Sequence, residues 1–279
     1  MNIANNLFSV LLILIGLLGN LSAHAADDSF QPIRGQPGKD VIWIPTPPAL
    51  VTAMLSMAKV TPSDVVYDLG AGDGIIAITA AKQFGARSFG IEYDEKMAQF
   101  ARRNAQQAGV ADKVKIIHGD IFVEDFSQAS VVTLYLLPSL NLKLRPTILQ
   151  MKPGTRVVAH AFDMGDWEPD QTAQAAGASA FMWTVPAYVE GEWEVKGLPG
   201  AASARLSLRQ SFQRIGGNLH LAGYSQPLLG ARIEGGQLSF QFMGPNNSLQ
   251  SVTVTVNGAA MSGSVKANYD ANSIEAKRL

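Results

Sequence analysis

The sequence predicts an α/β protein, with a doubly wound, mainly parallel sheet followed by a C-terminal antiparallel all-β domain. Three observations lead to this fold class. From residue 64 to residue 162, short apolar runs alternate with helical stretches, which is typical of βαβ units. A turn with three glycines at alternate positions follows the first of these runs. Beyond Gly191, only short alternating runs separated by turn residues remain, as in a β-sandwich or a small barrel.

Length and composition set the outer limits. The 279 residues are enough for one large or two modest domains, and a hydrophobic content of 47% supplies real cores. A net charge of −1 gives no electrostatic argument for a nucleic-acid partner. The chain has no cysteine, so disulfides, thiolate metal ligands and cysteine nucleophiles are excluded.

The N-terminal 25 residues have the features of a targeting segment. An almost unbroken apolar run from Leu7 to Leu18 precedes small residues that fit an A-x-A cleavage site ending at Ala25. The run is short for a membrane span of about 20 residues. We therefore expect residues 1–25 to be a signal peptide and the protein to be periplasmic or secreted. Basic residues follow the run and none precedes it, so an uncleaved inner-membrane anchor is the alternative.

The next segment connects this leader to the α/β domain. Residues 26–40 are rich in Gly, Pro and polar side chains and predict an extended arm. In residues 41–48, three prolines within four positions favour extended backbone. Residues 49–59 have apolar side chains at helical spacing. The prolines either begin this helix or help to close a ligand site, and the sequence leaves both interpretations open.

The α/β domain is expected to span residues 41–189. Right-handed crossovers between its strands require a mainly parallel sheet with helices on both faces. Residues 163–179 are expected to form a loop with a short helix, and residues 180–189 a last strand. The expected core elements are strand 64–69, helix 75–84, strand 87–92, helix 94–109, strand 114–118, strand 130–137, helix 140–151 and strand 155–162.

Residues 190–279 are expected to form a separate β domain, either a sandwich or a small barrel. Gly-Gly-Asn, Gly-Gly and Asn-Gly sequences supply its turns, including one expected at residues 216–218. Its alternation of apolar and polar residues predicts a lined ligand cavity or a partner surface. The expected strands are 192–196, 204–213, 218–224, 228–233, 237–242, 251–256, 261–267 and 273–278.

The three-glycine turn indicates a ligand site at the carboxyl end of the first strand. Its glycines permit positive φ and leave backbone open to a ligand at a helix N-terminus. A dinucleotide fingerprint requires a glycine where this chain has Ile75. No Gly-Lys-Ser/Thr follows, so the turn is not a P-loop.

Three motifs together resemble the class I S-adenosylmethionine-dependent methyltransferases. They are Asp68-x-Gly70-x-Gly72-x-Gly74, the acidic end of the second strand in residues 90–94, and residues 118–122 after the third strand. The resemblance implies a Rossmann-like fold and the cofactor S-adenosyl-L-methionine. It also implies that Glu92 pairs with the ribose hydroxyls, that Asp120 accepts from the adenine amino group, and that Ile121 or Phe122 flanks the ring. The implied cofactor-binding set is Asp68, Gly70, Ala71, Gly72, Asp73, Gly74, Glu92, Tyr93, Asp120 and Ile121.

The charges of these motifs agree with that cofactor. S-adenosylmethionine has a cationic sulfonium, an ammonium group, hydroxyls and an adenine, and it has no phosphate. Acidic residues at three successive strand ends suit such a ligand and would repel a phosphate. Each acid alone is more often a helix cap or a solvated turn residue, so the prediction depends on the ordered set.

A narrower resemblance covers residues 41–167. Residues 43–47, 134–138 and 152–156 are similar to the small mitochondrial-type protein-lysine methyltransferases and their bacterial relatives. This implies N-methylation of a protein lysine or another amine. Many methyltransferases acting on planar amines have Asn/Asp-Pro-Pro-Tyr after the fourth strand. Residues 137–139 are Leu-Pro-Ser, which argues against methylation of a base or a glutamine.

A lysine acceptor must lose its proton before methyl transfer, and the positions just beyond the fourth strand and ahead of the first motif suggest which residues assist. We expect Tyr135 to line an aromatic pocket that desolvates the amine, and Pro138 to shape it. We expect Pro45, Thr46 and Pro47 to close over the cofactor. Tyr135 as an ordinary buried strand residue is the alternative. We expect His118 and His160 to have structural roles rather than metal-binding ones, and no metal site is predicted.

A second class of function stays open at this point. S-adenosylmethionine is a cytosolic metabolite, whereas the leader indicates export or membrane proximity. The alternative is a catalytically weak, methyltransferase-like binding protein of the cell envelope that acts through its β domain. The sequence identifies neither the methyl acceptor nor the oligomeric state.

Overall fold

The computed structural model describes residues 30–221, 223–244, 247–267 and 270–279, so the predicted leader lies outside the described residues. Within these ranges, no helix combines the length and apolar character needed to cross a bilayer. The first sheet and its helices consist of α2 Pro48–Met57, β1 Val65–Leu69, α3 Ile75–Phe84, β2 Arg87–Glu92, α4 Glu95–Gln107, β3 Val114–His118, β4 Val131–Leu134, α5 Pro138–Leu149, β5 Arg156–His160, β6 Gln171–Ala175 and β7 Ala178–Thr184.

This sheet has the strand order β3-β2-β1-β4-β5-β7-β6. The strands β1 to β5 are parallel, and only β7 pairs with them in the antiparallel direction, followed by its hairpin partner β6. The prediction of a doubly wound, mainly parallel sheet is therefore confirmed. The direction of the strand order reverses between β1 and β4, and in such sheets ligands bind at the carboxyl ends of the strands beside this switch point.

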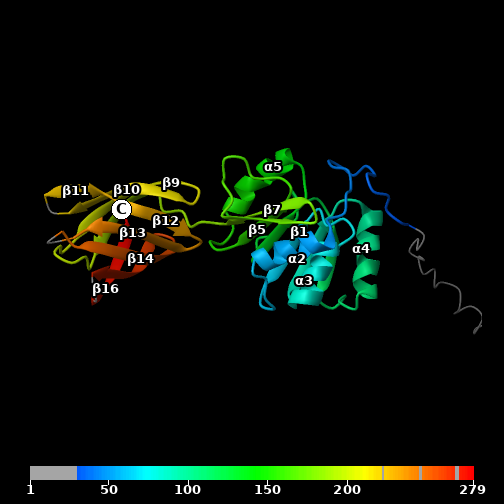
Figure 1. Ribbon diagram of the computed structural model, residues 1–279, viewed down its shortest axis with the longest axis horizontal. Helices are drawn as coiled ribbons and strands as arrows, with labels where there is room; N and C mark the ends of the chain where they lie inside the picture. The colour runs from blue at the N-terminus through cyan, green and yellow to red at the C-terminus, as the bar shows by residue number, and fades with distance from the viewer. Residues whose placement is uncertain (1–29, 222, 245–246, 268–269) are drawn as a thin grey trace, which may run out of the picture. The chain divides into compact units, whose positions relative to one another are not determined.

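Strand periodicity directs successive side chains to opposite faces of the sheet. In β1, Val66 packs into the core beneath α2 and α3, whereas Tyr67 packs into the core beneath α5. Figure 1 shows α5 on the other side of the sheet from α2 and α3. The central strands are buried on both faces, which explains their nearly continuous apolar sequences.

The helix ends follow local chemistry. Pro48 and Pro138 occupy the first positions of α2 and α5, where a missing N–H costs nothing. Asp94 caps α4 by accepting a hydrogen bond from the backbone N–H of Met97 at 2.8 Å. Gly85 ends α3 in the left-handed conformation.

The prediction of a loop with a short helix at residues 163–179 is wrong. Residues 171–175 form the edge strand β6, and Ala176 and Gly177 connect it to β7 with φ values of 53° and 75°. Two successive positive φ values characterise a type I′ hairpin turn. The sequence signal was weak because an edge strand with one exposed face needs few apolar residues, and β6 is Gln-Thr-Ala-Gln-Ala.

The second sheet is entirely antiparallel and closes into an eight-stranded barrel. The pairing runs from β10 through β12, β13, β14, β15, β16 and β8 to β9, which pairs with β10 again, while β11 extends the edge of β10. Its strands are β8 Gly191–Lys196, β9 Ala204–Ser211, β10 Arg214–Leu221, β11 Tyr224–Pro227, β12 Leu229–Glu234, β13 Gln237–Met243, β14 Leu249–Asn257, β15 Ala260–Ala267 and β16 Asp270–Arg278.

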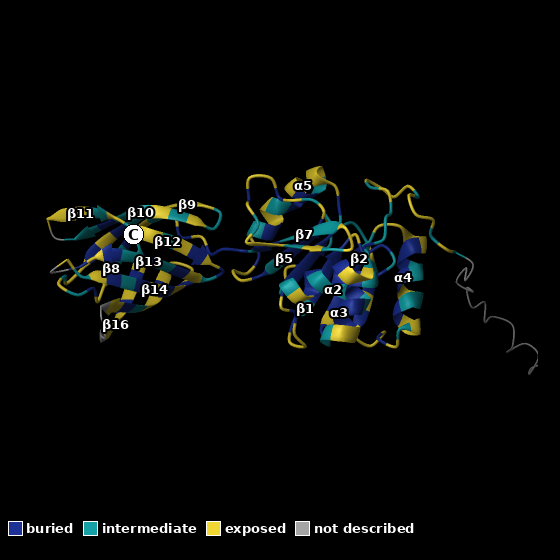
Figure 2. Ribbon diagram, in the orientation of Figure 1, coloured by how far each residue is buried: buried dark blue, intermediate teal, exposed yellow. Residues whose placement is uncertain are grey.

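Side chains fill the interior of this barrel. Trp193, Phe240 and Phe242 are almost fully buried in one hydrophobic core, and Figure 2 shows the alternation of buried and exposed residues along β13 and β14. Eight strands enclose a space that is just wide enough for side chains. The predicted β domain is therefore a barrel rather than a sandwich, and these alternating side chains form a packed core.

The turn predicted at residues 216–218 is wrong. Gly216 and Gly217 lie inside β10, and the connection to β9 passes through Phe212, which has a φ of 53°. A side chain at Gly217 would place its Cβ 2.0 Å from the backbone oxygen of Ser207. Glycine is needed here for close strand approach, which a sequence pattern cannot distinguish from a turn.

Candidate active site

The loop after β1 is shaped by three left-handed glycines. Gly70, Gly72 and Gly74 have φ values of 82°, 56° and 80°. A Cβ on Gly72 would lie 2.6 Å from the indole nitrogen of Trp43, and one on Gly70 would lie 2.9 Å from a methyl group of Leu136. Backbone conformation and close contacts therefore both require glycine at the first two positions.

Two acids, one in β1 and one in this loop, are shielded from water. Asp68 is only 2% exposed and accepts a hydrogen bond from Thr133 Oγ1 at 2.7 Å. Burial raises the pKa of Asp68 to about 7, against the effect of that hydrogen bond. Asp73 accepts from the backbone N–H of Ile75 at 3.1 Å, and burial raises its pKa as well.

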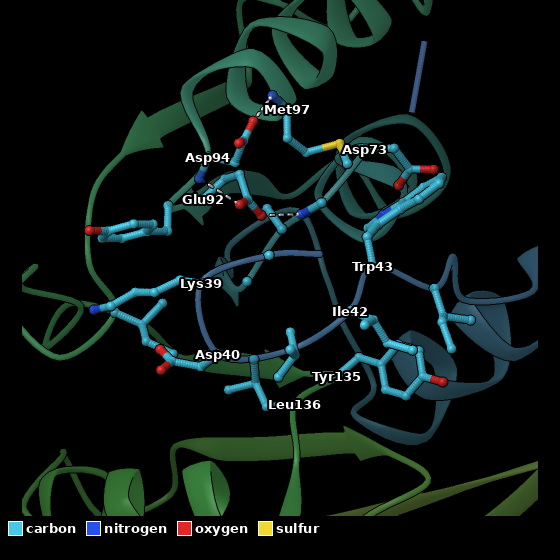
Figure 3. Close-up of a pocket in the computed structure, with 18 of the residues that line it drawn as sticks. Lys39, Asp40, Ile42, Trp43, Asp73, Glu92, Asp94, Met97, Tyr135 and Leu136 are labelled. Atoms are coloured by element: carbon cyan, nitrogen blue, oxygen red, sulfur yellow. Dashed lines mark hydrogen bonds between the residues drawn. The ribbon is translucent and has the colours of Figure 1, made fainter. Parts of the chain in front are cut away.

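Glu92 is the last residue of β2, and two backbone amides hold its carboxylate. One oxygen accepts from Gly72 N at 2.8 Å and the other from Asp94 N at 2.9 Å. Figure 3 shows both bonds and the position of Glu92 at the pocket. Burial raises the pKa of Glu92 despite these donors. The carboxylate therefore has a fixed orientation before any ligand binds.

Asp120 follows β3 and forms an ion pair with the arm. Its Oδ2 lies 2.7 Å from Lys39 Nζ, and its Oδ1 accepts from the backbone N–H of Phe122 at 2.9 Å. The hydrogen bond from Lys39 lowers the pKa of Asp120. The same ammonium group lies 4.4 Å from the centre of the Tyr93 ring. Lys39 therefore bridges two residues of the predicted cofactor set.

The arm itself folds into a small hairpin against this pocket. Gly35 N donates to Trp43 O at 2.8 Å, and Trp43 N donates to Gln36 O at 2.9 Å. Every residue from 36 to 46 lines the pocket, and Figure 3 shows Lys39, Asp40, Ile42 and Trp43 around it. The hairpin includes residues on both sides of position 40, where we expected the arm to end.

The part of the pocket that follows β4 and β5 has a different character. β4 ends at Leu134, so Tyr135 lies just beyond the strand, half-buried, and lines the pocket. Leu137 and Phe162 line the same end. No charged side chain lines the pocket beyond β4 among the described residues, whereas the end near β1, β2 and β3 is rich in carboxylates.

The structure brings most of the predicted site residues into this one pocket. The members that line it are Pro45, Thr46, Asp68, Gly70, Ala71, Gly72, Asp73, Glu92, Tyr93, Asp120, Ile121 and Tyr135.

Three predicted site residues lie outside the pocket lining. Gly74 is the buried N-cap of α3, where an added Cβ would lie 3.2 Å from the Cβ of Ala101. Pro47 is the N-cap of α2, and Pro138 is an exposed first residue of α5. Their positions fit the start and packing of helices rather than ligand contact.

The pocket also contains residues that we did not predict. Met97 and Leu140 lie in the first turns of α4 and α5, and Phe162 lies after β5. A signal was present for these three, because first helical turns and strand ends meet at the ligand edge of such sheets. No signal singled out Lys39, a lone lysine in a segment rich in Gly and Pro.

The charges of the pocket lining determine which ligand fits. Among the described residues, six carboxylates line the pocket, and the one basic lining residue is Lys39, which is paired with Asp120. A cationic ligand with hydroxyl donors is complementary to this set, whereas a phosphate is not. The described residues also contain no group of three or more His, Asp or Glu side chains placed to hold a metal ion.

Comparison with known proteins agrees with this chemistry. Residues 68–171 match the family described as ANTKMT methyltransferase domain. A protein-lysine N-methyltransferase from Saccharolobus islandicus is 41% identical over 154 residues, which cover 54% of this chain and 95% of that protein. A lysine N-methyltransferase from Mus musculus, named for a subunit of ATP synthase, is 34% identical over 38% of this chain and 43% of that protein.

A crystal structure from Salinibacter ruber, described as an RNA methyltransferase in complex with S-adenosyl-L-homocysteine, shows the same fold. It is 52% identical with a TM-score of 0.51, covering 52% of this chain and 96% of that one. These similarities agree with the acidic pocket in assigning S-adenosyl-L-methionine as the cofactor. The chain is a class I S-adenosylmethionine-dependent methyltransferase and belongs to the lysine methyltransferase type of that family.

Proposed function

We propose that this enzyme transfers a methyl group to the side-chain amine of a lysine in a protein. The observation that carries the proposal is the uncharged, aromatic end of the pocket, formed by Tyr135, Leu137 and Phe162. The names of two relatives, both lysine N-methyltransferases, support the same acceptor.

The acceptor end suits an amine because a protonated amine has no lone pair to react. An apolar environment disfavours the charged form and lowers the pKa of a lysine that enters it. The bound cofactor supplies an already activated methyl group on a sulfonium. The remaining task of the protein is to hold the amine in line and exclude water. Tyr135, Leu137 and Phe162 provide walls for this purpose.

An RNA acceptor is the second candidate, because the 52% identical structure is described as an RNA methyltransferase. Phosphate contacts dominate the affinity of proteins for RNA and come from basic residues. This chain has a net charge of −1, and its pocket lining carries six carboxylates against one lysine. The charge distribution therefore favours the protein acceptor.

A transfer experiment separates these acceptors. The full-length enzyme is incubated with methyl-labelled S-adenosylmethionine and either a protein fraction or an RNA fraction, both prepared from cells of the source organism. We expect the label in protein, recovered as methyllysine after hydrolysis, and its loss with Tyr135→Ala. Label in RNA alone would replace the proposed acceptor.

If no transfer is detected, calorimetry with S-adenosylhomocysteine on the same preparation shows whether the protein still binds the cofactor product. Binding without transfer would direct the search to other amines. Absence of binding would instead favour an envelope binding protein that acts through its β barrel.

A further inference from the structure

The end of β5 is strained and is built into the acceptor end of the pocket. Ala161 has a φ of 66°, which is rare for a residue with a side chain. Phe162 N donates back to His160 O at 2.8 Å across this turn, and Phe162 lines the pocket. Strained residues of this kind persist where the surrounding structure determines them, often at functional sites.

The His160 side chain connects two further parts of the pocket wall. Its ring stacks on Tyr135, with ring centres 3.7 Å apart and planes inclined by 26°. Its Nδ1 lies 3.1 Å from Thr46 Oγ1 in a buried hydrogen bond. Tyr135 and Thr46 both line the pocket, whereas His160 is 5% exposed and lies behind them. One imidazole thus contacts the segment before α2 and the loop after β4.

The turn is also held from α5. Asn141 is buried, and its Nδ2 lies 3.2 Å from the backbone oxygens of Phe162 and Asp163. The turn after His160 is therefore fixed by its own hydrogen bond and by α5. Because the backbone after His160 is fixed in this way, the His160 side chain can hold the residues that it contacts in one orientation.

We propose that His160 is a positioning residue for methyl transfer: it holds the Tyr135 ring, which lines the acceptor end, against the segment before α2 through Thr46, without touching the substrate. The inference rests on the proposed function only in taking the Tyr135 side as the acceptor end. It holds for any acceptor that enters there. Burial lowers the pKa of His160, which agrees with a neutral imidazole in this position.

The test separates stacking from hydrogen bonding in the full-length protein. His160→Ala removes both contacts, His160→Phe keeps an aromatic ring, and Thr46→Val removes the hydrogen-bond partner. The matched control is His220→Ala in the barrel, where the imidazole Nε2 lies 2.9 Å from Ser207 Oγ. Thermal melting identifies the variants that fold.

We expect His160→Ala to lower kcat about 10- to 100-fold, because a small misplacement of reacting groups costs this much. The affinity for S-adenosylhomocysteine should stay within about threefold of wild type, since the acids at β1 to β3 are unaltered. His160→Phe should recover most of the kcat that His160→Ala loses, because its ring can still stack on Tyr135. Combining Thr46→Val with His160→Phe should be no worse than the more impaired single variant, since both remove the same hydrogen bond.

A spectroscopic measurement makes the test independent of the acceptor. In protein labelled with 3-fluorotyrosine, Tyr135→Phe assigns one of the six tyrosine signals. We expect this signal to shift in His160→Ala and to stay close to its wild-type position in the His220→Ala control. If His160→Ala does not fold, His160→Phe and Thr46→Val carry the kinetic comparison.

Two results would overturn the inference. One is a folded His160→Ala protein with wild-type kcat and an unchanged Tyr135 signal. The other is a loss of kcat that His220→Ala reproduces. Transfer of the label to RNA or to a small amine would overturn the lysine acceptor only, and the comparison of His160 variants would then be made with that acceptor.

Discussion

The ammonium nitrogen of Lys39 lies 2.7 Å from Oδ2 of Asp120 and 4.4 Å from the centre of the Tyr93 ring. The ion pair joins residues 81 positions apart and holds the arm against the end of β3. Asp120 is also the residue that the family resemblance assigns to the adenine amino group. If Asp120 takes that role, the lysine and the adenine would compete for one carboxylate.

Removing this competitor should strengthen cofactor binding. Because the ion pair is solvent-exposed and weak, we expect Lys39→Met to tighten the binding of S-adenosylmethionine only modestly, by about two- to fivefold. Added salt screens the ion pair, so it should reduce the difference in S-adenosylmethionine affinity between Lys39→Met and the wild type. Calorimetry measures both effects, and Asp120→Asn is the matched variant, which should bind more weakly. Weaker binding by Lys39→Met would show that the lysine supports the ligand instead.

Gly72→Ala should damage the site through a specific contact. The substitution puts a side chain at a φ of 56° and brings its Cβ within 2.6 Å of Trp43 Nε1. We expect a loss of stability of about 1–3 kcal/mol, measured by denaturant unfolding, and a loss of S-adenosylhomocysteine binding of at least about tenfold, measured by calorimetry.

Gly154→Ala is the control for that variant, because Gly154 has a φ of 95° and open space around it. It should be destabilised by a similar backbone strain while binding normally. Equal binding by both variants would show that the contact with Trp43 has no importance for the site.

Cofactor affinity should rise with pH around neutrality. Burial raises the pKa of Asp68 to about 7, so the free enzyme holds a proton there at about pH 6. A cationic ligand favours the ionised carboxylate, and binding must then release that proton. We expect affinity for S-adenosylmethionine, measured by calorimetry across this range, to increase by up to about tenfold per pH unit below about pH 7, and to level off above about pH 8.

The raised pKa of Asp68 also makes the stability of the ligand-free protein depend on pH, and this stability decreases as the pH rises. The pKa of Asp68 is higher in the folded chain than its ordinary value of 3.8, so the folded state binds more protons between these values. Its contribution to stability is therefore fully present below about pH 4 and decreases as the pH rises to about 7. Asp68→Asn should remove the part of the pH dependence of binding and of stability that comes from Asp68, whereas Asp73 and Glu92, whose pKa values burial also raises, keep their own parts. Unfolding titrations at several pH values measure the second effect.

Tyr135→Ala should impair transfer more than cofactor binding. Tyr135 belongs to the part of the pocket lining beyond β4, where the lining residues Tyr135, Leu136, Leu137, Leu140 and Phe162 are uncharged. We expect kcat to fall by about 10- to 100-fold, while Tyr135→Phe retains more activity because the ring remains. Pro138→Ala is the control, since Pro138 is exposed outside the pocket lining. Full turnover by both Tyr135 variants would remove this residue from the mechanism.

Gly217→Ala should destabilise the barrel. Its Cβ would lie 2.0 Å from the backbone oxygen of Ser207, so β9 and β10 would have to separate. The loss of stability should be about 3 kcal/mol. The neighbouring Gly216→Ala has open space and should cost much less. Denaturant unfolding monitored on the full chain measures the pair, and equal stabilities would contradict the role of close strand approach.

The sequence pattern was most informative where local chemistry and fold agree. Helix α3 spans Ile75–Phe84, and strands β2 and β3 span Arg87–Glu92 and Val114–His118, as predicted. In this part of the chain, apolar runs mark the strands, glycines mark the turns, and helical spacing of apolar residues marks the helix. The edge strand β6 was missed because an exposed strand carries little apolar signal.

By itself, the sequence predicted the parallel sheet and the acids at its strand ends, because these depend on residue types at short spacings, and the resemblance of its motifs to a known family implied the cofactor. Only the tertiary structure brought Lys39 to Asp120 and His160 to Tyr135 and Thr46. These contacts join residues between 25 and 114 positions apart, and no local periodicity encodes such distances. They depend on which strand ends become neighbours, and the sheet order decides that.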